Sequence, residues 1–595
     1  PRSHARPARR SPDRVDDFEL TLTKIDRATA SQLGRALARY GEGLNRSGRP
    51  QEAVGAYEEA VQLLEQAVLR EGNLATCHDL AHAQDHLSTV LQAVVSQQAG
   101  VAAAQRAVKI WQRLYDADGP GQWAFRLAGA REKLAWSLLE AEREDEAADE
   151  FDEGLRLVAL SDARGTWGGR EVEAVLLRGR AVLNRRRGRL RSALTDCLAA
   201  TARLEGQGDG PMPLTALSSR QDCHRTLSGI YSDEPLHHFS MMAARKAHAD
   251  ALTLREAGIS SEGHWAEALI HLASALFRYG DAPRAAYRAK QAVTLCRRLI
   301  ADGRTDLTAS ATRMLSLLGD ARLQLGQLPK AVVSLREAIA DEASVVLPQA
   351  TADQSRRMAQ AELRTAARKL QYVLAIDPDE LSADYLRDPT QALRQLVERM
   401  QRWLRVRPRK VRALLTEVRA ELENSTSISL QGGTDIASTV LGREAGMLAW
   451  LCKAHPSRAC DELALELNIA LATMAGYVNR YPAGERACRQ ALSTGTRLLE
   501  TRDDDHIARQ VITAHCLMVT NRASTYDYAS AELELARMRA FESGRPRPLR
   551  DAPDSAFTAD LLAEMQAERG DGPPSKFFGG SQPPLFDEPV PYETW

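Results

Sequence analysis

The sequence has few aromatic residues and no strand pattern comparable in extent to its helical pattern. Aromatic residues make up 5% of the 595-residue chain, whereas hydrophobic residues of all kinds make up 44%. Ala and Leu must therefore supply most of the core, which suits closely packed helices better than a β-sandwich or β-barrel. We predict an all-α fold.

Paired cysteines and long apolar runs are also missing. The eight cysteines are widely spread and none forms a C-x-x-C pair, so we expect buried, reduced thiols. No stretch approaches membrane-spanning length, and no apolar segment of the kind found in signal peptides follows the basic N-terminus. We expect a cytoplasmic protein without membrane contact. Because the chain begins at Pro1 rather than Met, we expect a processed product or a piece of a longer protein.

Charge of one sign is lacking as well. The net charge is −1 with 26% charged residues, so no global field favours nucleic acid or an anionic membrane. The chain has no Gly-x-Ser-x-Gly, no P-loop lysine and no nucleotide-binding fingerprint. Catalysis therefore has no residues to depend on, and we predict a protein that is not an enzyme and holds no cofactor.

What the chain does have is a repeated pattern of small and apolar residues. In the stretch from residue 315 to residue 338, the pattern predicts two helices separated by a break. The residues that carry it are Leu315, Gly319, Gly326, Ala331, Leu335 and Ala338. Seven copies occur, and the last small residue of each falls at 60, 107, 154, 200, 247, 292 and 338. Such even spacing predicts one two-helix geometry repeated along the chain.

This pattern resembles the tetratricopeptide repeat (TPR). The common unit of that family has about 34 residues, so the hairpins here are longer, with helices of roughly 20 residues. HEAT and armadillo repeats have a similar length, but the small residues here fall where the two helices of a TPR hairpin cross. The resemblance implies an α-solenoid, a right-handed superhelix in which each hairpin buries its apolar side against the next.

We expect four regions along the chain. They are a mobile basic N-terminus at residues 1–18, an array of about seven TPR-like hairpins at 19–345, a degenerate helical-repeat segment at 346–545, and a linker, short helix and extended aromatic and acidic tail at 546–595.

The resemblance also implies a groove for a protein or peptide, lined by the first helix of each hairpin. The solvent-facing positions that it nominates are Glu42, Arg46, Trp136, Arg178, Arg185, Phe277 and Asp320. An exposed Trp near Arg side chains is a plausible anchor, although each of these residues equally well only packs or solvates its helix. The family's clamp for acidic chaperone tails needs Lys and Asn at such positions, so we do not expect a chaperone-tail receptor.

Two further clusters give alternative hypotheses. His78, His82 and His86 share one helix face, but no carboxylate or cysteine set completes a zinc site and HExxH is absent, so we predict no metal. A metal-dependent enzyme that uses this histidine stripe is therefore only the third and least favoured hypothesis. The second is a nucleic-acid-associated adaptor, because the segment from Arg399 to Arg412 places six arginines and one lysine around Trp403, whose indole would stack on a base. A helix end with a solvated turn explains the same segment.

The tail alternates acids with large apolar residues, which predicts a motif that docks on a partner or in the groove of this or another copy of the array. Its residues are Phe577, Phe578, Leu585, Phe586, Tyr592 and Trp595. An unbound tail is the alternative. The leading hypothesis is a non-catalytic protein- or peptide-binding scaffold or sensor arm of a larger bacterial-type signalling, regulatory or defence assembly. It resembles, by fold alone, the sensor arrays of STAND-type ATPases and the partners of CHAT-type proteases.

Overall fold

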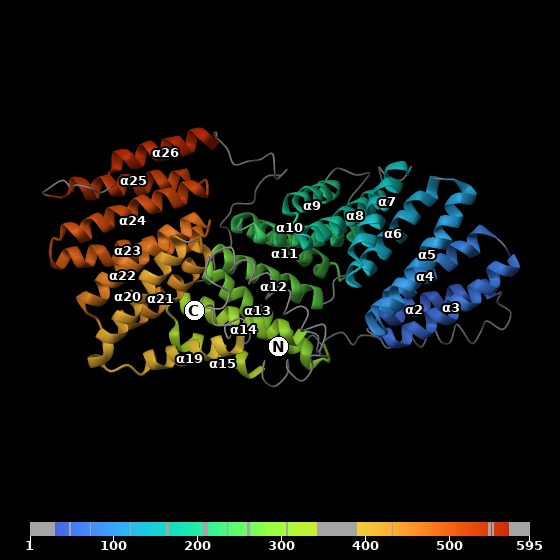
Figure 1. Ribbon diagram of the computed structural model, residues 1–595, viewed down its shortest axis with the longest axis horizontal. Helices are drawn as coiled ribbons and strands as arrows, with labels where there is room; N and C mark the ends of the chain where they lie inside the picture. The colour runs from blue at the N-terminus through green and yellow to red at the C-terminus, as the bar shows by residue number, and fades with distance from the viewer. Residues whose placement is uncertain are drawn as a thin grey trace, which may run out of the picture. The chain divides into compact units, whose positions relative to one another are not determined.

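The computed structural model describes residues 30–341 and 389–569, apart from loop gaps of one to six residues. The predicted mobile N-terminus and the predicted tail motif lie outside the described residues. The chain forms two compact units, residues 1–230 and 231–595, called unit 1 and unit 2 below. The described part contains 22 α-helices and no strand, which confirms the all-α prediction (Figure 1).

Unit 1 consists of antiparallel helix pairs that follow one another along the chain. In order they are α2 (Ala30–Arg46) and α3 (Pro50–Glu71), α4 (Leu74–Val94) and α5 (Gln97–Asp118), α6 (Gly121–Glu140) and α7 (Glu144–Leu160), and α8 (Trp167–Arg186) and α9 (Leu190–Glu205), followed by α10 (Leu214–Asp233), in which the unit boundary falls. Each helix packs mainly against its neighbours in the chain, as a solenoid requires.

Unit 2 continues with helices of the same kind. They are α11 (His237–Glu256), α12 (Glu262–Tyr279), α13 (Ala282–Ala301), α14 (Thr308–Gln324), α15 (Leu328–Asp341), α19 (Pro389–Leu404), a 3-10 turn (Pro408–Lys410), α20 (Val411–Leu430), α21 (Thr434–Ala454), α22 (Arg458–Tyr477), α23 (Tyr481–Thr501), α24 (Asp505–Ser524), α25 (Tyr528–Ser543) and α26 (Ser555–Arg569). Within the described residues, no helix is both long and apolar enough to span a bilayer.

Small residues allow the two helices of a hairpin to approach closely. A Cβ atom added at Gly41 would lie 3.1 Å from the ring of Tyr57, and one added at Gly319 would lie 2.5 Å from Leu335. The last small residue of every copy is buried on its second helix, at 60, 107, 154, 200, 247, 292 and 338. The predicted hairpin pattern is therefore confirmed as a packing pattern.

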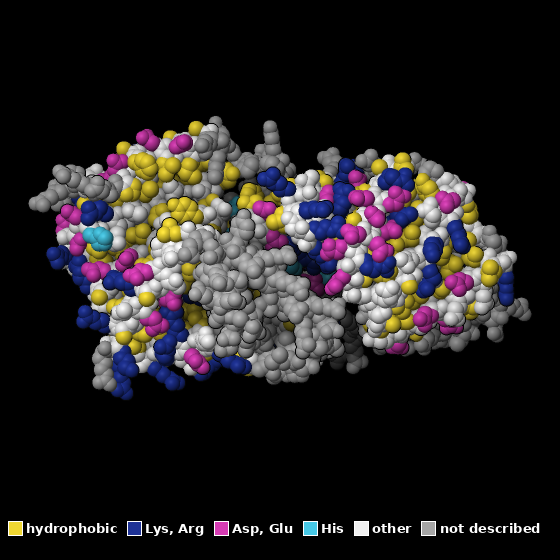
Figure 2. Space-filling view, viewed as in Figure 1, with side chains coloured by type: hydrophobic (Ala, Val, Ile, Leu, Met, Phe, Trp, Pro, Cys, Tyr) yellow, Lys and Arg dark blue, Asp and Glu magenta, His cyan; other side chains and the backbone are white. Residues whose placement is uncertain are grey.

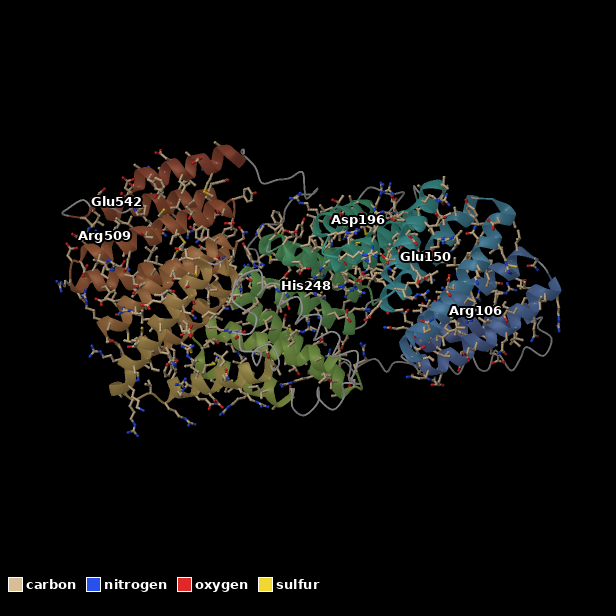
Figure 3. The ribbon with its side chains drawn as sticks, viewed as in Figure 1. Arg106, Glu150, Asp196, His248, Arg509 and Glu542 are labelled. Carbon is tan, nitrogen blue, oxygen red and sulfur yellow. The ribbon has the colours of Figure 1, made fainter. Side chains whose placement is uncertain are left out.

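Partly buried ion pairs between the two helices of a hairpin add to this packing in unit 1. Glu150 of α7 accepts a hydrogen bond from Arg131 of α6 at 2.6 Å, and Asp196 of α9 accepts two from Arg180 of α8 at 2.7 and 3.0 Å (Figure 3). Each pair joins the first and second helix of one hairpin, so these polar contacts hold together the same two helices as the apolar packing.

Several turns between first and second helices contain one residue with positive φ, a conformation that favours Gly. In the predicted array these residues include Glu142, Gly188, Gly280 and Gly326, with φ between 61° and 90°. In the predicted degenerate segment they are Gly432, Asn479 and Tyr526, which succeed one another every 47 residues. The segment thus keeps the hairpin length of the array although its turn residues differ.

In unit 2, two stretches far apart in the sequence pack together. Helix α21 lies against α14 so closely that a Cβ atom added at Gly446 would come within 1.8 Å of the carbonyl oxygen of Leu323. Arg443 of α21 forms an ion pair with Asp320 of α14 at 2.7 Å. Helix α21 therefore covers the part of α14 that contains Asp320 and Leu323.

Candidate protein-binding surface

The first helices of unit 1 are joined to one another by polar contacts. Lys133 of α6 lies 3.4 Å from Asp85 of α4, and Ser137 of α6 donates a hydrogen bond to Gln92 of α4 at 3.1 Å. The partners are 45 to 48 residues apart, which is about one repeat. The repeat thus brings equivalent positions of successive first helices side by side.

Trp136 and Arg178 form the centre of this surface. The guanidinium carbon of Arg178 in α8 lies 4.7 Å from the ring centre of Trp136 in α6, a cation–π contact. The ring of Phe151 meets the indole edge-on at 5.9 Å, and Asp222 of α10 lies 3.7 Å from the guanidinium. Trp136 is partly buried and the Arg178 side chain is 15% exposed, so each is held by packing while a small part of it stays accessible.

Burial makes the charges of this surface unusual. Burial raises the pKa of Glu132 to about 7, and Lys133 and Arg178 oppose that rise. Asp85 accepts a hydrogen bond from the Trp111 indole at 3.3 Å, and its side chain is almost fully covered. We call six residues of this surface the first-helix cluster: Asp85, Glu132, Lys133, Trp136, Arg178 and Asp222.

Three polar atoms of the first-helix cluster have no hydrogen-bond partner in the described part of the chain: Asp85 Oδ1, Trp136 Nε1 and Arg178 Nε. The Trp136 N–H lies next to the Glu132 carboxyl without reaching hydrogen-bond geometry. Buried polar atoms are normally paired with protein or water, so these three leave bonding capacity for water or a ligand.

The structure brings together only two of the seven residues predicted to line the groove, Trp136 and Arg178. Arg185, also on α8, packs against Gly229 of α10, and Glu42 is partly buried on α2. The side chain of Arg46 is outside the described part.

The other two lie in unit 2 and are already engaged. Asp320 pairs with Arg443 and its side chain is 15% exposed, whereas Phe277 is partly buried and its carbonyl lies 3.5 Å from Arg480. Sequence reasoning missed four cluster members, Asp85, Glu132, Lys133 and Asp222. Their separation from their partners by about one repeat is a signal that would have identified them.

The histidine stripe packs against aromatic rings. The rings of His78 and His82 meet Trp111 edge-on at 5.4 and 5.2 Å, and that of His86 stacks on Tyr57 at 5.7 Å. Burial, reinforced by the charges of neighbouring basic groups, lowers the pKa of His82 to about 3. In the described residues, no group of three or more His, Cys, Asp or Glu side chains is arranged to hold a metal ion.

The prediction that Trp403 stacks on a nucleic-acid base is wrong, because its side chain is fully buried in unit 2. Arg399, on the same helix, binds Glu444 at 2.6 and 3.0 Å and Glu417 at 2.7 Å. The basic residues of the segment that do face solvent are Arg402, Arg405, Arg407, Lys410 and Arg412. Trp403 therefore packs inside unit 2, and Arg399 forms ion pairs within it.

The structure forms no disulfide among the eight cysteines; five of them are buried, as expected, and Cys77, Cys452 and Cys516 are partly exposed. In Figure 2, basic and acidic side chains alternate over unit 1, so this face has no field of one sign.

No protein-family model and no curated protein matches this sequence. Among solved structures, the apo form of RapI is similar at 10% identity, with a TM-score of 0.39 over 71% of this chain and 99% of that one. A Rap protein complexed with competence and sporulation factor is 11% identical, with a TM-score of 0.34 over 79% of this chain and 100% of that one. BtubC (BKLC) from P. vanneervenii is 15% identical, with a TM-score of 0.34 over 43% of this chain and 92% of that one. At such TM-scores the likeness carries no argument about the site.

Proposed function

We propose that the protein is a non-catalytic scaffold that binds a protein or peptide across the first helices of unit 1. We further propose that it serves as a scaffold or sensor arm of a larger bacterial-type signalling, regulatory or defence assembly. The observation that supports binding is the contact between Trp136 and Arg178, partly buried and surrounded by charges of both signs.

The chemistry of the first-helix cluster favours a polypeptide ligand. Trp and Arg side chains held in partly desolvated positions are the residues that most often dominate protein interfaces. Lys133 of α6 and Asp222 of α10, whose side chains are 38% and 34% exposed, supply accessible charges of opposite sign, so the surface complements a segment that carries both acidic and basic groups. An extended segment would cross α4, α6, α8 and α10 in turn.

Nucleic-acid binding remains the second candidate, and its support is reduced. The buried Trp403 cannot stack on a base, and Arg399 is committed to two carboxylates. Only the exposed arginines and lysine of the segment remain for phosphate contacts.

Selection of a peptide from a display library on the purified full-length chain, followed by fluorescence anisotropy, tests the proposal. We expect Trp136→Ala and Arg178→Gln each to lower the affinity for the selected peptide about tenfold or more. Arg288→Gln is the matched control, because it removes a cation–π arginine, 5.3 Å from the ring of Tyr287, on the second helix α13. Unchanged affinity in both cluster variants, with folding intact by circular dichroism, would contradict the proposal.

A further inference from the structure

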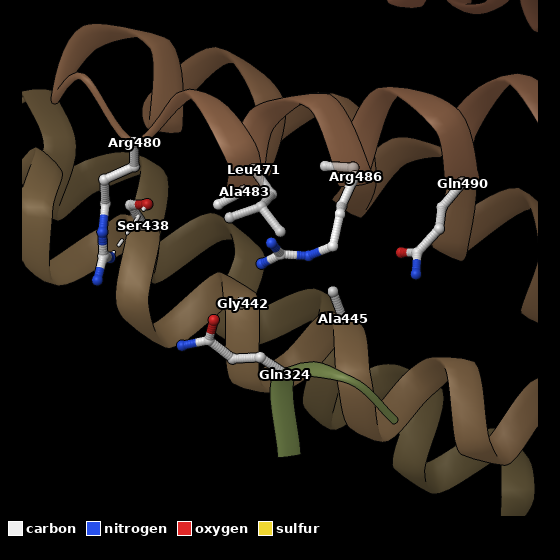
Figure 4. Close-up of a pocket in the computed structure, with 10 residues that line it drawn as sticks. Gln324, Ser438, Gly442, Ala445, Leu471, Arg480, Ala483, Arg486 and Gln490 are labelled. Atoms are coloured by element: carbon white, nitrogen blue, oxygen red, sulfur yellow. Dashed lines mark hydrogen bonds between the residues drawn. The ribbon is translucent and has the colours of Figure 1, made fainter. Parts of the chain in front are cut away.

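A small pocket that opens to solvent lies between α14, α21, α22 and α23 of unit 2, with about 20 Å³ of space for the centres of water-sized atoms inside an open hollow of about 390 Å³. Its walls contain small residues, among them Gly442, Ala445 and Ala483, which leave the space unfilled. Arg480 and Arg486 enter it from α23 and its N-terminal turn (Figure 4). The pocket therefore combines two cationic side chains with small apolar walls.

Arg480 is 4% exposed and is held by oxygen atoms of backbone and side chains. Its Nε donates to the carbonyl of Arg278 at 2.8 Å, and its Nη1 donates to the hydroxyl of Thr439 at 2.7 Å. The nearest carboxylate is that of Asp435, at 3.8 Å, and this side chain is 55% exposed. The positive charge of Arg480 is thus only weakly compensated.

Arg486 is compensated even less. Its Nη1 donates to the carbonyl oxygen of Gly280 at 2.6 Å, the single hydrogen bond that it forms in the described part of the chain. No carboxylate of the described residues forms an ion pair with it, although Asp281 and Glu485 attract its charge from a longer distance while Arg480 and Arg489 repel it. Burial lowers the pKa of Arg486 to about 10, so the guanidinium stays protonated at neutral pH.

The two arginines also have a structural role. Both bind carbonyl oxygens at the C-terminal end of α12 (Glu262–Tyr279), where the helix dipole favours positive charge. A guanidinium has five N–H donors, however, and one contact leaves most of those of Arg486 unused. The side-chain amides of Gln324 and Gln490 also line the pocket and offer further donors. Such donor groups suit an anion with several oxygen acceptors.

We propose that this pocket binds an oxyanion, a carboxylate or phosphate group of a small ligand, with Arg486 as its main contact and Arg480 as the neighbouring charge. This site lies in unit 2 and is separate from the peptide surface proposed for unit 1. Bound oxygen atoms would take up the free guanidinium donors and neutralise the buried positive charge.

Isothermal titration calorimetry and thermal unfolding of the full-length chain test the inference with inorganic phosphate and citrate, against chloride at matched ionic strength. We expect phosphate, citrate or both to bind and to raise the unfolding temperature beyond the chloride control. A response to one of them alone assigns the group as phosphate or carboxylate, and a response to both assigns an oxyanion site without preference.

Two variants assign the response to the pocket. Arg486→Gln removes the main contact, and Gln490→Glu places a competing carboxylate at an exposed lining position without disturbing the core. Each should weaken anion binding about 10- to 100-fold, the usual effect of a charged hydrogen bond. Arg489→Gln, on the exposed side of the same helix, should leave it unchanged.

Absence of any anion response beyond that of chloride would overturn the inference. So would an undiminished response in Gln490→Glu, which decides the matter even where Arg486→Gln fails to fold. A purely structural role of the arginines predicts that Arg486→Gln lowers the unfolding temperature equally in all three salts. None of these measurements involves a peptide, so failure here would leave the proposed function of unit 1 unaffected.

Discussion

The Nε of Arg480 donates a hydrogen bond to the carbonyl oxygen of Arg278 at 2.8 Å, although the two residues are 202 positions apart in the chain. Arg486 forms a second such bond, to Gly280, over 206 positions. These contacts attach the turn before α23 to the end of α12, so the later hairpins of unit 2 build on the earlier ones and do not form a separate array.

Gly446→Ala should destabilise unit 2 strongly. The added Cβ would lie 1.8 Å from the Leu323 carbonyl oxygen, a backbone atom, so α21 and α14 must separate. We expect a loss of about 3 kcal/mol or more in the free energy of unfolding, measured by urea denaturation. Gly442→Ala is the control on the same helix, since its Cβ comes no closer than 3.5 Å to Gln324. That change should gain about 0.5–1 kcal/mol, and equal effects of both variants would argue against this packing.

Glu132→Gln should change how stability depends on pH. Burial raises the pKa of Glu132 to about 7 from 4.5, so between these values the folded chain keeps a proton that the unfolded chain releases. Stability of the native protein therefore falls as pH rises through this window. The variant should match the native protein at pH 4 and exceed it above pH 7 by up to about 3 kcal/mol in unfolding free energy.

Chemical denaturation at pH 4, 6 and 8 measures this difference. Glu59→Gln, an exposed carboxylate on α3, is the control and should show no such pH-dependent gain. A difference between Glu132→Gln and the native protein that stays constant across this range would show that the Glu132 carboxyl is not buried in the folded chain.

Trp403→Ala should reduce stability, since the indole is fully buried among residues of unit 2. Truncating a buried Trp costs about 3–5 kcal/mol, which calorimetry would detect as a lowered unfolding temperature. The double variant Arg405→Gln and Arg407→Gln changes exposed residues and should leave stability within about 0.5 kcal/mol. A low-salt mobility shift that this double variant abolishes would instead support the nucleic-acid hypothesis.

Gly179→Ala should loosen the packing between hairpins of unit 1. The added Cβ would lie 2.2 Å from the ring of Phe151, in α7 of the preceding hairpin. We expect a loss of about 1–3 kcal/mol, seen as faster amide hydrogen exchange in α7 and α8. Gly129→Ala, which meets nothing within 4 Å on α6, should slow exchange or leave it unchanged. Indistinguishable exchange in the two variants would refute this contact.

The site was only half predictable from sequence, and Trp136 and Trp403 show why. Both are Trp residues near arginines on predicted helices, and local pattern treats them alike. Trp136 remains half-buried beside Arg178, whereas Trp403 is fully enclosed because helices later in the chain cover it. The Arg178 that contacts Trp136 lies 42 positions along the chain, and the cluster that encloses Trp403 draws on helices from α14 to α24, so local spacing does not encode either environment.

The hairpin period also shows where sequence reasoning ended. Gly188, Gly280 and Gly326 mark turns in the predicted array, but Asn479 and Tyr526 adopt the same positive φ in the later segment without being Gly. Because the predicted pattern required glycine at the turn, we expected that segment to be a degenerate repeat. The backbone conformation shows that it keeps the same length of hairpin.

The sequence by itself determined the helical hairpins, their length and their small-residue contacts, because these depend on residues within one repeat. Only the tertiary structure decided that α21 covers α14, that Arg480 and Arg486 meet at one pocket, and that Trp403 is enclosed. Those contacts join residues that local periodicity leaves unrelated, and their free energy is gained only when the distant helices have already folded against each other.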